Sequence, residues 1–250
     1  MKRALIVLAH PNPASFNARL ARLGKAVLTE SGYDVRLLDL YTIEFPPPSE
    51  ISDFTHAFDK TDFDYKAEQR AAYLNGTFHE SISACQKMIA QSDLLIFQFP
   101  MWWFSMPSVL KNWIEKCFSF DFAYNGRERR WFSDGPFRGK TVLLSITTSG
   151  PRHIYTDKGI NGDINTILWP IQNGIFHFVG FRVLPAFVSW ASDTHNRDKR
   201  HLIEQAYADR LRTIDQDEPI PFHPLDHFTE EYLLREGYDD VQKGSRRAVK

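Results

Sequence analysis

Short apolar runs alternate with amphipathic segments along most of this chain, and this alternation restricts the possible folds more than any other feature. The first run, residues 4–9, is apolar throughout, as expected of a parallel strand that is covered on both faces. The segment after it carries leucine and valine at helical spacing and ends at Ser31-Gly32, a typical helix stop. The same order recurs, which predicts strands over 4–9, 34–38, 93–99, 141–146 and 182–188 and helices over 16–30, 82–91, 108–117, 164–179 and 197–214. The pattern therefore predicts an α/β fold in which a doubly wound, five-stranded parallel sheet has helices on both faces.

The length of the chain, 250 residues, is enough for one large domain with a substantial core. We expect one domain over residues 1–218 and a C-terminal arm over 219–250, whose last, basic residues are expected to be disordered. Residues 43–61 carry three consecutive prolines and scattered acids, so this stretch is expected to be a long surface loop.

Composition argues against several classes of function. The net charge is −1 and no long basic run occurs, so the electrostatic signature of a nucleic-acid-binding protein is missing. Cys85 and Cys117 are the only cysteines and lack framework spacing, which argues against a disulfide scaffold and favours a reducing cytoplasm. The most apolar region, residues 94–107, is interrupted by a glutamine and two prolines, so no insertion into a membrane is expected. The nine histidines are scattered, and no metal site is expected among them.

Function in a doubly wound sheet is expected in the loops at the carboxyl ends of the strands. The loop after the first predicted strand contains Ser15, a good helix N-cap, and the free N–H groups of the turn after it form an anion site. Neither G-x-G-x-x-G nor the P-loop motif is present, which disfavours a dinucleotide-binding Rossmann domain and a P-loop enzyme. The capping serine alone is also compatible with a purely structural role.

Two further loops at this edge carry aromatic side chains. Residues 100–107 place two tryptophans and a phenylalanine between two prolines that restrict the path of the loop. These rings could frame a planar heterocycle, or they could simply plug the end of the sheet. Residues 147–161 supply hydroxyl and N–H groups together with Tyr155, whose phenol could stabilise a developing anion on a flavin or quinone oxygen. Tyr155 could also be a partly buried loop tyrosine without a chemical role.

Three long segments, taken in order, resemble the NAD(P)H:quinone oxidoreductases of the DT-diaphorase type. The first is ALIVLAHP followed by SFN, near the start, and the second is IFQFPMWWFSMPSVLKNW, in the middle. The third, towards the end, is GPFRGKTVLLSITTSG followed by a tyrosine and then by GINGDINTILWPIQNGIFHFVGF. The resemblance runs from Ala4 to about Pro221. It implies a flavodoxin-like fold, a tightly held FAD, with FMN less favoured, and a homodimer whose active sites lie at the subunit interface. It also implies ping-pong hydride transfer, in which NADPH or NADH reduces the flavin and leaves before a quinone enters.

The resemblance also implies roles for individual residues. Tyr155 matches the tyrosine thought to stabilise charge on the reduced flavin, and Asn161 occupies the position of its catalytic partner. The residues implied in cofactor binding are His10, Ser15, Phe16, Asn17, Pro100, Met101, Trp102, Trp103, Phe104, Thr147, Thr148, Ser149, Gly150, Tyr155 and Arg200. Those implied in the substrate pocket over the flavin are Trp103, Phe104, Ala123, Tyr124, Asn125 and Phe178, with Tyr124 reaching in from the other subunit.

Several positions depart from the family pattern. Asn161 stands where well-known members have a histidine, and an amide can hydrogen-bond but cannot take up a proton near neutral pH. A branch of the family that also has asparagine there prefers dihydronicotinamide riboside, so the reductant stays open between this compound and NAD(P)H. Ser149 replaces a glycine, and Asp64 replaces a glutamine. Residues 126–131, GRERRW, have no close counterpart in the family, and their arginines could attract NADPH phosphates or form a solvated surface cluster.

Two other functions fit the same sequence. The same pocket could serve a flavin-dependent reductase of nitro or azo compounds, and relatives with this fold act as ancillary regulatory subunits of potassium-efflux systems. The second role would need a surface for a membrane partner, to which nothing in the sequence points. A one-electron flavodoxin carrier is disfavoured, because the chain is long and lacks strong acidity. The sequence thus predicts a two-electron quinone reductase, with a quinone or a related small molecule as its acceptor.

Overall fold

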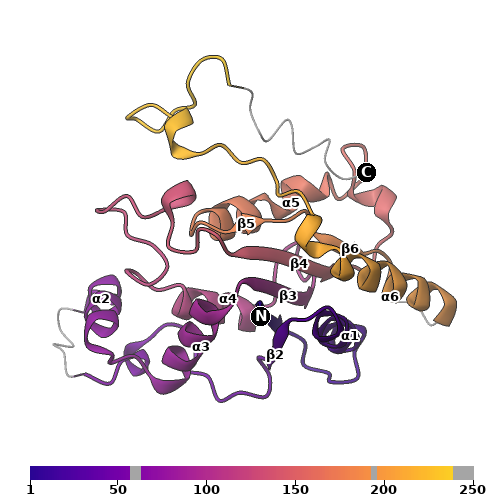
Figure 1. Ribbon diagram of the computed structural model, residues 1–250, viewed down its shortest axis with the longest axis horizontal. Coiled ribbons are helices and arrows are strands. Elements are labelled where there is room, and N and C mark those ends of the chain that lie inside the picture. Colours follow the sequence, from indigo (N-terminus) through magenta and orange to yellow (C-terminus); the bar gives the residue numbers. More distant parts are fainter. Residues whose placement is uncertain (57–62, 193–195, 239–250) are drawn as a thin grey trace.

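A computed structural model of the protein describes residues 1–56, 63–192 and 196–238, so the predicted disorder at the end of the arm lies outside the described residues (Figure 1). A parallel sheet with the strand order β2-β1-β3-β4-β5 forms its centre, and a sixth, short strand also pairs with β4. This is the flavodoxin-like order, and the predicted fold class is confirmed. The strands are β1 Arg3–Leu8, β2 Asp34–Asp39, β3 Leu94–Pro100, β4 Thr141–Thr147, β5 Arg182–Val183 and β6 Phe187–Ser189.

Helices cover both faces of the sheet, as Figure 1 shows. One face packs against α1 and α6, which also contact each other, and the other packs against α3, α4 and α5. Side chains of β1 alternate between the two cores, Ile6 towards α1 and α6 and Leu5 towards the opposite face, as the period of a strand requires. The helices are α1 Phe16–Glu30, α2 Tyr65–Asn75, α3 Glu80–Gln91, α4 Ser108–Cys117, α5 Ile164–Ile171 and α6 Arg197–Arg212.

Two predicted elements are interrupted in the structure, and a proline lies at each interruption. The helix predicted over 164–179 ends as an α-helix at Ile171 and continues as a π-helix over Gln172–His177. Pro170 has no N–H for the helical ladder, so the regular bonding is broken just before this wider turn. The strand predicted over 182–188 is divided into β5 and β6, because Pro185 between them cannot donate a ladder hydrogen bond.

Helix α2 was not predicted, because its sequence is polar and has only a weak apolar stripe. Its ends nevertheless carry the usual signals. Asp64 is the N-cap, accepting hydrogen bonds from two backbone N–H groups, and Gly76 ends the helix with a φ of 68°. Asp64, which replaces the family glutamine, therefore has a capping role in this chain.

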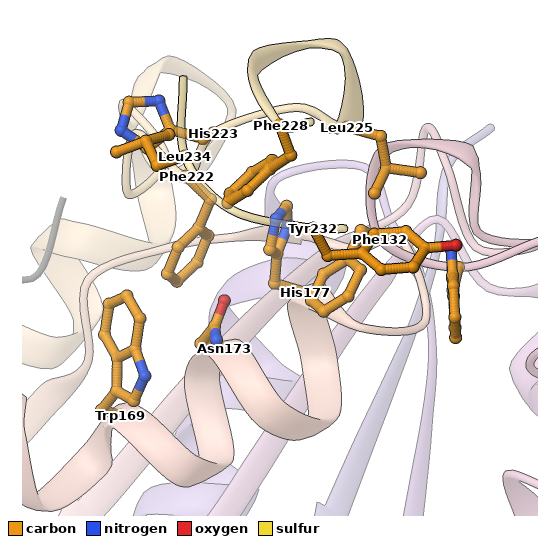
Figure 2. A pocket seen from close by; sticks show the side chains of 11 residues that line it. Phe132, Trp169, Asn173, His177, Phe222, His223, Leu225, Phe228, Tyr232 and Leu234 are labelled. Carbon is orange, nitrogen blue, oxygen red and sulfur yellow. The ribbon is translucent and has the colours of Figure 1, made fainter. Parts of the chain in front are cut away.

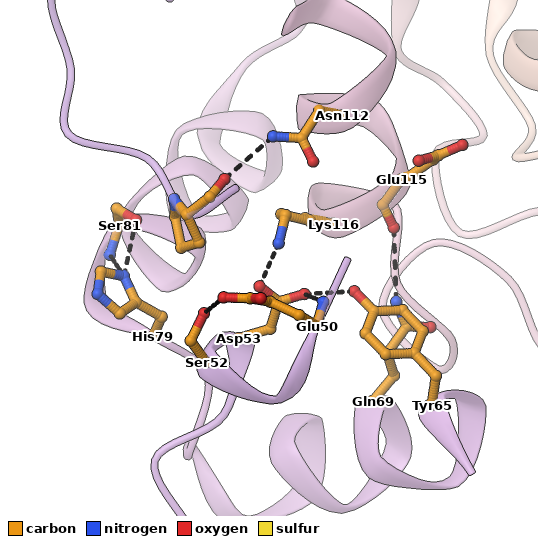
Figure 3. Close-up of polar contacts among 11 residues, drawn as sticks. Glu50, Ser52, Asp53, Tyr65, Gln69, His79, Ser81, Asn112, Glu115 and Lys116 are labelled. Carbon is orange, nitrogen blue, oxygen red and sulfur yellow. Dashed lines mark hydrogen bonds and ion pairs between the residues drawn. The ribbon is translucent and has the colours of Figure 1, made fainter. Parts of the chain in front are cut away.

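A buried ion pair fastens the segment before α2 to α4 (Figure 3). Lys116 and Asp53 are both completely buried and contact each other directly, and the Tyr65 hydroxyl donates to the second oxygen of the Asp53 carboxylate at 2.6 Å. Nearby, the Gln69 amide accepts from the Phe120 backbone N–H at 3.1 Å. These contacts tie α2 to the loop that follows α4.

The C-terminal arm, residues 219–238, leaves the sheet beside β5 and lies over α5, where Figure 1 draws it in yellow. Ile220 N–H donates to the Val183 carbonyl at 2.8 Å, and Leu225 N–H donates to the Ser133 hydroxyl at 3.1 Å. Within the described ranges, every helix is too short or too polar to cross a lipid bilayer.

Candidate active site

The loops after β1, β3 and β4 meet at the carboxyl edge of the sheet, because these three strands are neighbours in it. Met101 N–H donates to the Thr147 carbonyl at 2.9 Å, which joins the second loop to the third. The Asn17 amide donates to the Thr147 hydroxyl at 2.9 Å, which joins the first loop to the third. The predicted cofactor-binding segments 10–17, 100–104 and 147–150 therefore lie together.

The first loop prepares the N-terminus of α1 for an anion. Ser15 caps the helix, its hydroxyl accepting from Ala18 N–H at 3.1 Å, and the remaining N–H groups of a first helical turn have no partner within a helix. The loop before the cap is fixed by its own side chains: Asn12 N–H donates to His10 Nδ1 at 3.0 Å and Ala14 N–H donates to the Asn12 amide oxygen at 2.8 Å. Burial lowers the pKa of His10, so this ring is neutral at neutral pH.

Arg200, from the first turn of α6, lies beside this helix terminus. Its guanidinium carbon is 5.5 Å from the centre of the Phe16 ring, and its Nε is buried without a hydrogen-bond partner in the described part of the chain. A cation with an unused donor next to free helical N–H groups fits a phosphate group. The donors at this end of the sheet could therefore hold a phosphate group.

The second loop holds its aromatic residues in a strained turn. Trp103 and Phe104 have φ values of 50° and 58°, and Trp102 and Ser105 close the turn with two backbone hydrogen bonds. Two-residue turns of this kind usually contain glycine or asparagine, and each non-glycine residue in such a conformation costs about 1–3 kcal/mol. Trp103 is 96 % exposed, so packing against the described residues does not explain why the loop presents it. Strain that places a large apolar ring in solvent is typical of a binding surface.

The third loop positions Tyr155 and Asn161. Thr148 is buried and its hydroxyl donates to the Gly150 carbonyl at 2.9 Å, while Ser149 between them is exposed. Tyr155 ends a short 3-10 helix, and its ring packs 5.3 Å from that of Trp190. Asn161 N–H donates to the Ile154 carbonyl at 3.0 Å, so the backbone brings the two predicted catalytic residues to the same turn.

The predicted substrate-pocket residues do not all lie at this edge. Phe178 packs with Tyr124, at 5.5 Å between ring centres, and its carbonyl accepts from Phe132 N–H at 2.7 Å. Arg182, four residues later, pairs with Thr141 at the start of β4, whereas the cofactor loops lie at the end of that strand. At about 3.3 Å per residue, seven residues of strand separate these positions by roughly 20 Å. One chain therefore carries Trp103 and Phe104 on one surface and Tyr124 and Phe178 on another.

The two other predicted pocket residues have roles in the fold of the chain. Ala123 is completely buried. The Asn125 amide oxygen accepts from the backbone N–H groups of Arg127 and Glu128, and its nitrogen donates to Asp121. Asn125 therefore closes the turn that begins the loop over 126–131.

A cavity of about 580 Å³ lies between the arm and the π-helix, and it was not foreseen from the sequence (Figure 2). In Figure 2, Asn173 and His177 rise from the helix towards the arm. His177 stacks on Phe222 at 4.4 Å, and burial lowers its pKa to about 4, so it is neutral at neutral pH. The cavity walls are mainly aromatic and come from Trp131, Phe132, Trp169, Asn173, His177, Phe222, His223, Leu225, Phe228, Tyr232 and Leu234.

Across the described ranges, no group of three or more potential metal-ligating side chains is arranged to hold an ion.

Comparison with known proteins agrees with the fold. The profile of a family described by its flavodoxin-like fold matches residues 2–214. The NAD(P)H dehydrogenase [quinone] 1 of Cavia porcellus is 38 % identical over 251 residues, which cover 98 % of this chain and 90 % of the relative. The chain belongs to the NAD(P)H:quinone oxidoreductase family.

Other members of the NAD(P)H:quinone oxidoreductase family are similar to the same extent. The ribosyldihydronicotinamide dehydrogenase [quinone] of Pongo abelii is 39 % identical over 223 residues, covering 88 % of this chain and 95 % of the relative. The crystal structure of a provisionally named quinone reductase from Klebsiella pneumoniae has a TM-score of 0.88 and 33 % identity, with 94 % of each chain covered. Relatives named for different nicotinamide reductants are thus about equally close in sequence.

Proposed function

We propose that this protein is an FAD-dependent oxidoreductase that reduces quinones by two electrons, using a reduced nicotinamide compound. The observation that carries the proposal is the junction of three loops at the carboxyl edge of the sheet, which combines an anion site, an exposed aromatic turn and Tyr155. The similarity to quinone dehydrogenases over 98 % of the chain supports the same activity.

The residues at this edge fit a flavin nucleotide. The N-terminus of α1 and Arg200 would hold the phosphates, and segments 100–104 and 147–150 would frame the isoalloxazine ring. The family resemblance favours FAD over FMN as this nucleotide. When bound, the flavin would supply hydride transfer, so the protein has to bind, orient and shield it. Reductant and quinone would use the same face in turn, which is the ping-pong order.

Tyr155 would donate a hydrogen bond to charge that develops on the reduced flavin. Asn161, joined to the same turn, can orient a neighbouring group but cannot accept a proton as a histidine would. We propose NADPH or NADH as the reductant, with dihydronicotinamide riboside as the compound to test beside them. Proton uptake would then pass through water rather than through residue 161.

A homodimer would complete the substrate pocket. Trp103 and Phe104 lie at one end of β4 and Tyr124 and Phe178 at the other, so a single chain cannot place all four around one ligand. A second copy, placing its Tyr124 and Phe178 over the exposed Trp103, would enclose the acceptor and bury that ring.

We further propose that residues 1–218 form the catalytic domain, with 219–250 as its extension. Two buried free cysteines fit a reducing cytoplasm as its location.

The visible spectrum of the purified protein, before and after anaerobic addition of NADPH, tests the proposed function. We expect an oxidised-flavin spectrum that bleaches in one step and recovers on addition of a quinone. Extraction and chromatography of the flavin would distinguish FAD from FMN. A protein that binds neither flavin would contradict the proposal, and a bound flavin that no nicotinamide reduces would contradict the enzymatic part of it.

Tyr155→Phe is expected to slow flavin reduction about tenfold while leaving the flavin bound, because it removes one hydrogen bond to developing charge and keeps the ring against Trp190. Stopped-flow absorbance at saturating reductant measures this rate. Tyr73→Phe, on the exposed side of α2, is the matched control and should leave the rate unchanged. Equal rates in the wild type and Tyr155→Phe would remove the proposed role of the phenol.

A further inference from the structure

A glutamine lies buried in the middle of the sheet, in a strand that is otherwise apolar. Gln98 belongs to β3, is fully buried, and pairs with Leu8 on one side and Ser145 on the other. Its backbone carbonyl accepts from Ala9 N–H at 3.0 Å, so its position in the sheet is fixed. Burying an amide is costly unless its polar atoms are paired, which calls for an explanation of this residue.

The Gln98 side chain begins a chain of hydrogen bonds that ends at the candidate active site. Its Nε2 donates to the Asn17 amide oxygen at 2.8 Å, and the Asn17 nitrogen donates to the Thr147 hydroxyl at 2.9 Å. Gln98, Asn17 and Thr147 are all buried. Asn17 lies in the first turn of α1, and Thr147 is the last residue of β4. The chain therefore connects the centre of the sheet to two of the three cofactor loops.

The direction of these bonds determines what Thr147 can do. The Thr147 oxygen accepts from Asn17, which leaves its hydroxyl hydrogen to be donated elsewhere, and no acceptor for it is found among the residues that the structure describes. If the Gln98 and Asn17 amides were both turned over, the Thr147 hydroxyl would donate to Asn17 and would have no hydrogen left for a ligand. The Gln98 NH₂ group would then be unpaired, instead of its carbonyl oxygen. Buried N–H groups without an acceptor are rarer than buried carbonyls without a donor, so the observed direction is favoured.

We infer that Gln98 is a positioning residue that sets the orientation of the Asn17 amide and thereby keeps the Thr147 hydroxyl as a donor to the bound cofactor. This inference rests on the proposed function, because it requires a flavin at the carboxyl edge of the sheet. It goes beyond that function by giving a role to a residue that cannot touch the cofactor. The unpaired Gln98 oxygen is consistent with this role, because a buried amide that served the fold alone would be expected to have both of its polar atoms paired.

The test compares Gln98→Met with Ser145→Ala. Methionine is close to glutamine in length but cannot donate, so Asn17 is free to turn and the Thr147 hydroxyl is no longer held as a donor. We expect the dissociation constant of FAD from the reconstituted protein to rise about tenfold, the effect of one ordinary hydrogen bond. The melting temperature of the flavin-free protein should change little. Ser145→Ala removes a hydroxyl opposite Gln98 that lies outside the chain of bonds, so it should leave the dissociation constant of FAD unchanged.

Thr147 provides a second test, at the other end of the chain of hydrogen bonds. Thr147→Val should weaken FAD binding to a similar extent and Thr147→Ser should restore it, because only the latter keeps a hydroxyl. In the Gln98→Met background this difference between Ser and Val should disappear. Unchanged FAD binding in Gln98→Met, or a Ser–Val difference that persists in its background, would overturn the inference. A wild-type protein that binds no flavin would instead contradict the proposed function itself.

Discussion

Gly159→Ala is expected to reduce quinone reductase activity about a hundredfold while leaving most of the fold intact. A Cβ at this position would lie 2.3 Å from the Ile154 carbonyl oxygen and 2.8 Å from that of His153, both backbone atoms that cannot move aside alone. The turn carrying Tyr155 would therefore have to shift. Displacing a catalytic group by about 1 Å can cost two orders of magnitude in rate. Steady-state assays with NADPH and a quinone measure the effect, and the absorbance of bound flavin shows whether the cofactor is retained.

Gly174→Ala is the matched control for this prediction. An added Cβ at Gly174 meets nothing within 4 Å and its φ lies outside the left-handed region, so this variant should keep wild-type activity. The two variants carry the same substitution and differ only in the atoms that surround the added Cβ. Full activity in Gly159→Ala would mean that the position of the Tyr155 turn does not limit turnover, and the assignment of the active site to this loop would be wrong.

The sequence was a good guide wherever the local pattern and the tertiary structure required the same residues. The β1, β3 and β4 strands are mainly apolar, because both of their faces are covered, and helix α1 carries a cap and an apolar stripe. The meeting of the three loops at one edge of the sheet could therefore be predicted from the sequence. Their contacts, such as the bond from Met101 to Thr147, agree with that expectation.

Features that depend on contacts far apart in the sequence could not be foreseen. Lys116 looks like a charged residue near the end of a helix, and nothing nearby in the sequence shows that Asp53 will meet it in the interior. Gln98 looks like an interruption of an apolar run, and its partner Asn17 lies 81 positions away. The cavity beneath the arm likewise needs the path of residues 219–238, which short-range periodicity does not specify.

The site residues were placed by resemblance, and the structure divides them into two surfaces. The family resemblance assigned these residues to one pocket and gave only Tyr124 to the other subunit. Tyr124 and Phe178 pack against each other at one end of β4, and Trp103 is exposed at the other. The exposed aromatic turn and the distant aromatic pair are explained together if two copies share each active site, which is why the dimer is part of the proposed function.

Lys116→Met is expected to lower the free energy of unfolding by about 3–5 kcal/mol, because it leaves the Asp53 carboxylate buried without its cation. For a chain of this size each kcal/mol corresponds to about 2–4 °C, so the melting temperature should fall by roughly 10 °C. Lys111→Met is the matched control on the same helix. Lys111 is half exposed in its pair with Glu115, and losing such a pair costs at most about 0.5 kcal/mol. Denaturant unfolding of the three proteins gives the comparison.

The cost of Lys116→Met should come from an unpaired charge rather than from lost packing, and a further variant separates these causes. Adding Asp53→Leu and Tyr65→Phe removes the carboxylate and the hydroxyl that donates to it, so that no buried charge is left and only the Glu50 N–H, which donates to Asp53 at 3.3 Å, loses its acceptor. We expect this triple variant to recover most of the lost stability. A triple variant as unstable as Lys116→Met would mean that the shape of the lysine, and not its charge, holds the segment before α2 against α4. The loss should also be confined to stability, since the cofactor loops at the carboxyl edge of the sheet are built from other residues.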